Sequence, residues 1–424
     1  MASQLLSPLQ NAFPPDDMSA IKGMVTHLCH ENGFPPGIIR ISEIKGGSKN
    51  NIILFTWILT TLAPGSRMAP CMHYVLRTPR MQGGIPDLWI QRTAAFDFLS
   101  AKHFEVPKLY AYDTTCGNAL RSPYIIQQRM DGCTLLEKYR ILYHNYLTYG
   151  HYKPDSEYGE AASMISMYIE RQELAYQFEY YGTFQPVQGM ALKSYRPDRV
   201  KDRIGLTVKP FMDTLSMKAN STAIDFILEL LFMAESQTRN PDQEIKYQKI
   251  RHIALCIKVL DSNVIYRAAH RPEPSVLWHP NFQPSKIMMT AKPSYNDPIP
   301  YGPNGDLYHI ESYKLEAVLG WEGAMALPRI MTRCPPYFLW GEGPQVCEAD
   351  HYAWKCVSVD EMIEEGLPGW CEDAYGEMSI IVRALGFYAL FGVDFKWNEL
   401  PYEILMDVWS RIAPGTRDLE YATK

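Results

Sequence analysis

The sequence predicts an α+β fold with two lobes, a small antiparallel β-sheet lobe followed by a larger, mainly helical lobe. β-Branched and aromatic runs separated by turn residues dominate residues 35–130. Apolar residues at helical spacing dominate after residue 133. We therefore place the first lobe at residues 1–130 and the second at residues 131–424. The chain has 424 residues, 46% of them hydrophobic, which is enough for a two-lobed core.

The first lobe is expected to hold two helices and five strands. A helix is predicted over 18–32, because Ile21, Val25 and Leu28 recur at helical spacing. A second, amphipathic helix is predicted over 87–104. The strands are predicted as a hairpin within 38–59, with a Gly-rich turn, and at 73–80, 106–113 and 123–130.

The second lobe is expected to be mostly helical, with a few short strands. Residues 138–160 are rich in tyrosine and polar side chains, which indicates an inserted loop. A strand is predicted over 313–321, and short strands flank the stretch LWHPNFQPSKIMM at 277–289. The clearest helices are predicted over 162–182, 221–237, 246–269 and 377–392.

Composition excludes several classes of protein. The net charge is −6, so the basic surplus expected of a nucleic-acid-binding protein is missing. The apolar windows are short or interrupted by charge and glycine, which argues against membrane spans. Nine cysteines form no CxxC pair, and no secretory or mitochondrial leader is recognisable. We expect a soluble cytoplasmic protein with reduced thiols. The stretch HLCH at 27–30 lacks a second pair of metal ligands.

Two stretches look like catalytic motifs whose reactive residues are changed. In 277–289 the order is His279, Pro280, Asn281 and, five residues later, Lys286. Near the end of the apolar strand 313–322, Gly320 is followed by Trp321 and Glu322. The stretch RCPPYFLW lies further along the chain, at 333–340. Together these stretches resemble the kinase-like aminoglycoside phosphotransferase and choline kinase family, particularly its fungal branch. The resemblance runs from about residue 38 to about residue 340.

The resemblance implies a protein-kinase-like fold with a nucleotide between the lobes. The Gly-rich hairpin KGGSKNNI, with Gly46, Gly47 and Asn50, would lie over the phosphates, although a glycine pair between strands is often only a turn. Arg77 stands where the family usually has the strand lysine that reaches the phosphates. The residues Gln128 to Met130 would form the hinge that meets the adenine edge through backbone groups. Arg92 stands where a helix glutamate would pair with that basic residue.

The resemblance also implies lost chemistry. The family loop reads H-x-D-x-x-x-x-N, where the Asp orients the substrate hydroxyl and the Asn holds magnesium. Here Asn281 replaces the first and Lys286 the second, while Gly320 replaces the Asp that is the main metal ligand. These changes argue against the binding of Mg²⁺. Glu322 is a candidate substitute ligand for the ion. Alternatively, Lys286 could replace the charge of the ion. His279 is expected mainly to hold the loop.

Two hypotheses of function follow. The first is a pseudoenzyme, a pseudokinase that keeps the cleft for ATP or another nucleotide, for a small molecule, or for a protein partner. The second is an active enzyme on the same scaffold, either a small-molecule kinase with relocated catalytic groups or a repurposed enzyme of fungal secondary metabolism. Standard phosphoryl transfer is disfavoured in both. The sequence contains no Walker-type loop, no HExxH and no GxSxG, so no other catalytic motif competes.

Overall fold

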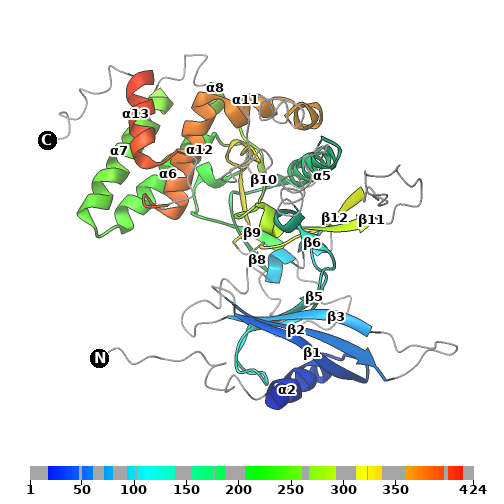
Figure 1. Cartoon of the computed structure of the whole chain (residues 1–424). Coiled ribbons are helices and arrows are strands. Elements are labelled where there is room, and N and C mark those ends of the chain that lie inside the picture. The colour runs from blue at the N-terminus through cyan, green and yellow to red at the C-terminus, as the bar shows by residue number, and fades with distance from the viewer. Residues whose placement is uncertain are drawn as a thin grey trace. The chain divides into compact units, whose positions relative to one another are not determined.

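The computed structural model of the chain (Figure 1) consists of two compact units, each containing helices and antiparallel sheet. The first unit comprises Met1–Glu157, Phe184–Thr207 and His279–Ala324, and the second comprises Tyr158–Thr183, Val208–Trp278 and Met325–Lys424. The predicted α+β class is confirmed. The structure describes residues 18–46, 50–60, 71–79, 93–96, 98–100, 104–138, 155–174, 177–186, 206–259, 267–292, 312–321, 323–336, 360–395 and 400–413.

The first unit contains an antiparallel five-stranded sheet in the order β1-β2-β3-β5-β4. All five strands lie where the sequence predicted them. Their bounds are Gly37–Gly46 for β1, Asn50–Leu59 for β2, Cys71–Pro79 for β3, Leu109–Asp113 for β4 and Tyr124–Gln128 for β5.

Alternation of side chains explains how this sheet is covered. On β2, Ile53, Phe55 and Trp57 point to one face and are buried. The helix α2 (Met18–Glu31) packs on that face through residues such as Val25 and Leu28 (Figure 1). Of the second predicted helix, residues 93–96 and 98–100 are helical, residue 104 is not, and the rest lies outside the described residues.

A small three-stranded sheet, also in the first unit, frames the stretch 277–289. Its order is β12-β11-β6, with β6 at Cys133–Thr134, β11 at Ile287–Lys292 and β12 at Ser312–Val318. The 3-10 turn η4 (Pro284–Lys286) leads directly into β11. The strand β12 ends at Val318, two residues before Gly320, whereas the sequence predicted a strand up to residue 321.

Another five-stranded sheet has the order β7-β10-β13-β8-β9. The sequence predicted one of its strands, β10, which precedes the loop, and did not reveal the other four. The strands of this sheet are only two to five residues long, too short for a clear alternation of side chains. They are β7 (Gln177–Phe178), β8 (Gly182–Pro186), β9 (Leu206–Pro210), β10 (Ser275–Trp278) and β13 (Met325–Pro328).

The helices of the second unit follow the predicted apolar pattern, with changed ends. The helix predicted over 162–182 is α5 (Asp155–Leu174), and the segment beyond it pairs with β10 as β7. The helix predicted over 246–269 is α7 (Pro241–Val259), followed by the short α8 (Arg267–His270). The others are α6 (Ala223–Gln237), α9 (Arg329–Thr332), α11 (Trp370–Tyr375), α12 (Glu377–Phe391), α13 (Tyr402–Ile412) and the 3-10 turn η2 (Leu215–Met217).

The core of the second unit is formed where α6, α7 and α12 pack together (Figure 1). Burial is nearly complete along α12, whose residues from Ile381 to Leu385 are all inaccessible to solvent. None of the described helices combines the length and the apolarity needed to span a bilayer.

Candidate functional site

His279 is fixed in one tautomer by two hydrogen bonds. The backbone N–H of Asn281 donates to Nδ1 at 3.1 Å, so Nδ1 must carry a lone pair. The Nε2–H then donates to the carbonyl oxygen of Leu319 at 3.0 Å. The ring is 4% exposed. His279 therefore ties the turn of the loop to the segment that leads into Gly320.

Leu319 is held to the loop through both of its backbone groups. Its carbonyl accepts from His279, and its N–H donates to the carbonyl oxygen of Lys286 at 2.7 Å. The preceding residue, Val318, donates its N–H to the carbonyl of Glu105 at 2.7 Å. The loop 277–289 and the end of β12 thus form one hydrogen-bonded frame.

Trp321 packs this frame from inside. Its ring lies edge-on to the His279 ring, with centroids 4.5 Å apart and planes at 71°. Its indole N–H donates to the carbonyl of Val318 at 3.1 Å, and the side chain is fully buried. The tryptophan retained after the motif strand therefore has a structural explanation.

The three positions at which the resemblance expects catalytic groups lie in this frame and offer no carboxylate to a magnesium ion. Asn281 is exposed and offers only a neutral amide, and Lys286 is half-buried and cationic. Gly320 is buried, has no side chain to offer, and has φ +89°. Magnesium requires oxygen ligands, mostly carboxylates and waters. Glu322, the candidate substitute ligand, lies outside the described residues.

Two further observations concern charge at the frame. Within the ranges that the structure describes, no three His, Cys, Asp or Glu side chains gather closely enough to hold a metal ion. Among the same residues, no carboxylate forms an ion pair with Lys286, whereas Lys314 on the neighbouring strand pairs with Glu316 at 3.3 Å. The cation of Lys286 is thus not neutralised by a described acidic side chain.

The residues predicted to meet nucleotide phosphates lie on the five-stranded sheet. Arg77 is half-buried on β3, opposite Ile52 of β2 and Ile125 of β5. Gly46 ends β1, and Asn50 begins β2. The hairpin is therefore formed as predicted, but Gly47 at its tip and Arg92 lie outside the described residues, so their placement stays a prediction.

One backbone donor of the predicted hinge has no acceptor among the residues that the structure describes. The N–H of Gln128 donates to the carbonyl of Lys108 at 2.8 Å, and the N–H of Arg129 donates to the carbonyl of His73 at 3.0 Å. The N–H of Met130 has no acceptor among the described residues. Of the three hinge residues, Met130 is thus the one whose N–H could meet a ligand.

Gly132 then brings the chain against the strand that follows the loop. A Cβ at this position would lie 2.0 Å from the carbonyl oxygen of Met289, and φ is +97°. Cys133 and Thr134 pair with Met289 and Met288 in the small sheet. The segment after the hinge is therefore anchored directly to β11.

The sequence did not reveal a network of buried charges in the second unit. We call it the buried charge network; it consists of Glu173, Arg271, Glu273, Arg333 and Asp373. Arg333 joins Glu173 to Asp373, and Arg271 joins Asp373 to Glu273. Glu273 and Asp373 are completely buried.

This network accounts for residues in an acidic run and in one motif. Within the acidic run at 371–377, Asp373 is a buried ion-pair partner of Arg271 and Arg333. The first residue of RCPPYFLW, Arg333, is the centre of the network. A charged residue within an apolar stretch was the available signal, but the partners could not be read from the sequence.

The network also surrounds the strand from which the loop begins. Gln172, next to Glu173, donates through Nε2 to the carbonyl of Leu277 on β10 at 2.8 Å. Glu273, two residues before β10, accepts the N–H of Ile330 at 2.9 Å. One side-chain hydrogen bond thus holds Leu277 of β10, and another holds the segment just before this strand.

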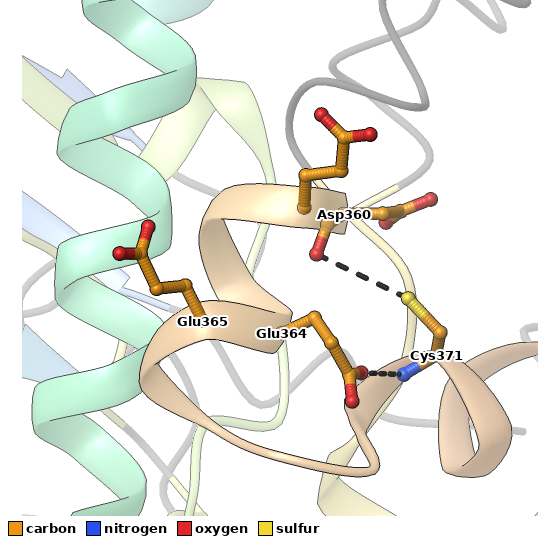
Figure 2. A pocket seen from close by; sticks show the side chains of 5 residues that line it. Asp360, Glu364, Glu365 and Cys371 are labelled. Carbon is orange, nitrogen blue, oxygen red and sulfur yellow. Dashed lines mark hydrogen bonds between the residues drawn. The ribbon is translucent and has the colours of Figure 1, made fainter.

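A pocket elsewhere in the second unit is acidic (Figure 2). It is lined by Asp360, Glu361, Glu364, Glu365 and Cys371. Glu364 accepts the N–H groups of Gly369 and Cys371 at 2.6 and 2.7 Å. Partial burial acts to raise the pKa of Glu364, but these N–H groups outweigh it and lower the pKa. Glu364 therefore stabilises the turn before α11, and no residue of the loop is among those that line the pocket.

Comparisons with known proteins give no relative by sequence. No protein-family model matches the chain, and no curated protein matches it. Solved structures match over most of the chain at low identity. An aminoglycoside phosphotransferase, APH(4)-Ia, in a ternary complex with ADP and hygromycin B, has 14% identity and a TM-score of 0.43, covering 92% of this chain and 98% of that chain.

Two further structures are similar to the same extent or less. The ethanolamine kinase of Plasmodium vivax has 12% identity and a TM-score of 0.43, covering 95% of this chain and 91% of that chain. An aminoglycoside phosphotransferase from Alicyclobacillus acidocaldarius has 10% identity and a TM-score of 0.29, covering 89% and 90%. The class of protein assigned here, an α+β protein with two units, rests on the chain's own sheets and helices.

Proposed function

We propose that this protein is a kinase-like pseudoenzyme that binds a nucleotide or a related anionic small molecule without magnesium and does not transfer phosphate by the standard mechanism. One observation carries the proposal. The frame of hydrogen bonds among His279, Leu319 and Lys286 is complete. The positions within it that resemble catalytic ones hold a neutral amide, a cation and a glycine. The hydrogen bonds that hold the loop are therefore present, while the side chains expected for catalysis are replaced.

Phosphoryl transfer depends on metal ions that bridge the phosphates and on a residue that orients the attacking hydroxyl. Asn281 cannot accept a proton as a carboxylate does. A cation at 286 and a missing side chain at 320 remove both predicted protein ligands of magnesium. Because groups that act as a unit are not additive, the combined loss is not a product of single losses.

Binding, in contrast, does not need these groups. The N–H of Met130, which has no acceptor in the part of the chain that the structure describes, could form a hydrogen bond to a planar ring such as adenine. Lys286 carries a positive charge that could replace the charge of a metal ion next to an anion. By the resemblance, Arg77 stands at the strand position whose basic side chain reaches the phosphates, and a guanidinium can bind phosphate oxygens. A protein partner is a further candidate ligand, and the same frame would then serve as a scaffold.

Thermal unfolding with ATP tests the proposal. ATP with EDTA is expected to raise the Tm of the wild-type protein, because a ligand that binds only the folded state stabilises it. Excess Mg²⁺ should not increase the shift. Lys286→Met is expected to abolish it, whereas Lys314→Met, on the exposed side of β12, should preserve it.

Three outcomes would count against this function. A shift that requires Mg²⁺ would show that the chain supplies metal ligands. If no nucleotide raised the Tm, the protein would not be a nucleotide-binding protein. A measured turnover that Asn281→Ala abolishes would show that the loop is catalytic.

A further inference from the structure

Two ion pairs join α6 to α7, which lie side by side in the second unit (Figure 1). Glu235 of α6 pairs with Arg251 of α7 at 3.0 Å, and Asp225 of α6 pairs with Lys258 of α7 at 2.9 Å. Residue numbers thus rise along α6 while those of the partners fall along α7, so the two helices are antiparallel. At both levels α6 supplies the carboxylate and α7 supplies the cation.

Two large apolar side chains face solvent between these ion pairs. Phe232 of α6 is 60% exposed, and Leu255 of α7 is 44% exposed. On each helix the apolar residue lies three, four or seven positions from the charged ones, so all of them project from the same face of that helix. Counted from either ion pair, Phe232 lies within about one helical turn of the level of Leu255.

These residues form one surface, which we call the α6–α7 face. Single exposed apolar side chains are common and need no explanation. Here two of them lie on adjacent helices and are bracketed by charges of fixed order, which is the anatomy of a small contact surface with an apolar centre and a polar rim. The face consists of Asp225, Phe232, Glu235, Arg251, Leu255 and Lys258.

The charges of this face match those of a second copy in one orientation. With a two-fold axis parallel to the helices, α6 of each copy lies against α7 of the other and every residue keeps its level. Glu235 then faces Arg251 of the partner subunit, and Asp225 faces Lys258 of the partner subunit. With the axis across the helices, α6 would lie against α6, and Glu235 would face Asp225 of the partner subunit, so like charges would repel.

We propose that the α6–α7 face is the contact surface of a homodimer whose two-fold axis runs parallel to these helices. Phe232 packs near Leu255 of the partner subunit, which removes both side chains from water. Each carboxylate of the face lies between a cation of its own chain and one of the partner subunit. Because two helices offer a small contact, the dimer forms at micromolar rather than nanomolar concentrations. This surface is independent of the function proposed for the loop.

Charge reversal tests both the dimer and its orientation. Glu235→Arg places only cations at this level of the contact, and Arg251→Glu places only carboxylates there. Each variant alone should therefore have the mass of one chain in light scattering after size exclusion, at concentrations where the wild-type protein has the mass of two. An equimolar mixture of the two variants should form a dimer with one chain of each, because residue 235 of either chain then faces the opposite charge at 251. Native mass spectrometry identifies that pair.

An apolar substitution gives a second test that leaves the ion pairs in place. Phe232→Asp should give a monomer with an unchanged circular dichroism spectrum, because the side chain it replaces is exposed. Met167→Asp is the matched control, since Met167 on α5 is 66% exposed and lies outside the α6–α7 face. This control should leave the dimer intact.

Three results would overturn the proposal. A wild-type protein that stays monomeric up to millimolar concentration would show that no second copy binds this face. A dimer that persists in Phe232→Asp and in Glu235→Arg would use another surface. If the mixture of folded Glu235→Arg and Arg251→Glu chains stayed monomeric, the assigned pairing across the two-fold axis would be wrong.

Discussion

Arg333 donates two parallel hydrogen bonds to the carboxylate of Glu173, from Nε at 2.9 Å and from Nη2 at 2.6 Å. The two side chains are only 3% and 9% exposed. The third nitrogen, Nη1, donates to Asp373 at 2.9 Å. One guanidinium thus bridges two buried carboxylates that come from different helices, and its planar fork makes this geometry specific to arginine.

Arg333→Met is therefore expected to lower the free energy of unfolding by about 3–5 kcal/mol, because it leaves buried carboxylates without their partner. Urea unfolding followed by circular dichroism measures this. The matched control is Arg411→Met, which removes an ion pair with Asp407 whose side chains are 67% and 70% exposed. That change should cost about 0–1 kcal/mol. Equal losses in the two variants would contradict the role given to the network.

Asp225 should make stability depend on pH at the start of α6. It accepts a hydrogen bond from Thr222 Oγ1 at 2.6 Å and forms an ion pair with Lys258 at 2.9 Å. Partial burial acts to raise the pKa of Asp225, but these two partners outweigh burial and lower the pKa. A lowered pKa in the folded state stabilises the protein above the unfolded-state pKa, and that contribution is lost as pH falls through the folded-state pKa.

Asp225→Asn should accordingly destabilise the protein at neutral pH by about 0.3–1 kcal/mol, a value discounted for the exposure of this side chain. The difference from wild type should vanish as pH falls below the folded-state pKa. Urea midpoints measured from neutral to acidic pH check this. Asp407→Asn, at an exposed carboxylate of α13, is the control and should show a smaller difference at neutral pH. A difference for Asp225→Asn that grows in acid would refute the sign.

The predictable part of the fold was the part with long, regular patterns. β2 alternates over ten residues, with Phe55 and Trp57 inward, so its sheet could be predicted. β7 has two residues, Gln177 and Phe178, and its strand state comes from pairing with β10 rather than from its own pattern. Because the apolar pattern of α5 continues into β7, the predicted helix extended past the actual end of α5 at Leu174.

The candidate site shows the same division. The loop at His279 could be located because its residues are adjacent in sequence. Arg333 and Glu173 are 160 residues apart, and no local pattern links them. Only the fold brings such partners together, so the buried charge network could not be predicted.

Gly132→Ala tests how closely the segment after the hinge approaches β11. A Cβ there would meet the carbonyl oxygen of Met289 at 2.0 Å, and φ is +97°. Gly33→Ala is a matched control, because Gly33 also has a positive φ, +72°, but open space around it. The control should cost about 1–2 kcal/mol from backbone strain alone. Gly132→Ala should cost clearly more in urea unfolding, and an equal cost would show that the contact with Met289 is not tight.

Gly320→Asp tests whether magnesium chemistry was lost at this position. Its φ of +89° is strained for an L-residue, although Asp tolerates positive φ better than most side chains. We expect a loss of about 1–2 kcal/mol in stability from this strain, and a further loss because position 320 is buried and the new carboxylate is desolvated. The new carboxylate should also make the ATP-induced shift in Tm increase on adding Mg²⁺, because a negative oxygen ligand replaces a hydrogen atom.

The control for Gly320→Asp is Gly323→Asp, three residues further, where φ is +83° and the nearest atom to a Cβ, on Pro280, is 4.0 Å away. It carries the same charge and similar strain but is only half-buried, so it should lose no more stability than Gly320→Asp and should gain no response to Mg²⁺. A response in both variants would reflect only added negative charge. If neither responded while both remained folded, the segment after β12 would not present its side chain to a nucleotide-bound metal, and Gly320 would not occupy the position of the lost ligand.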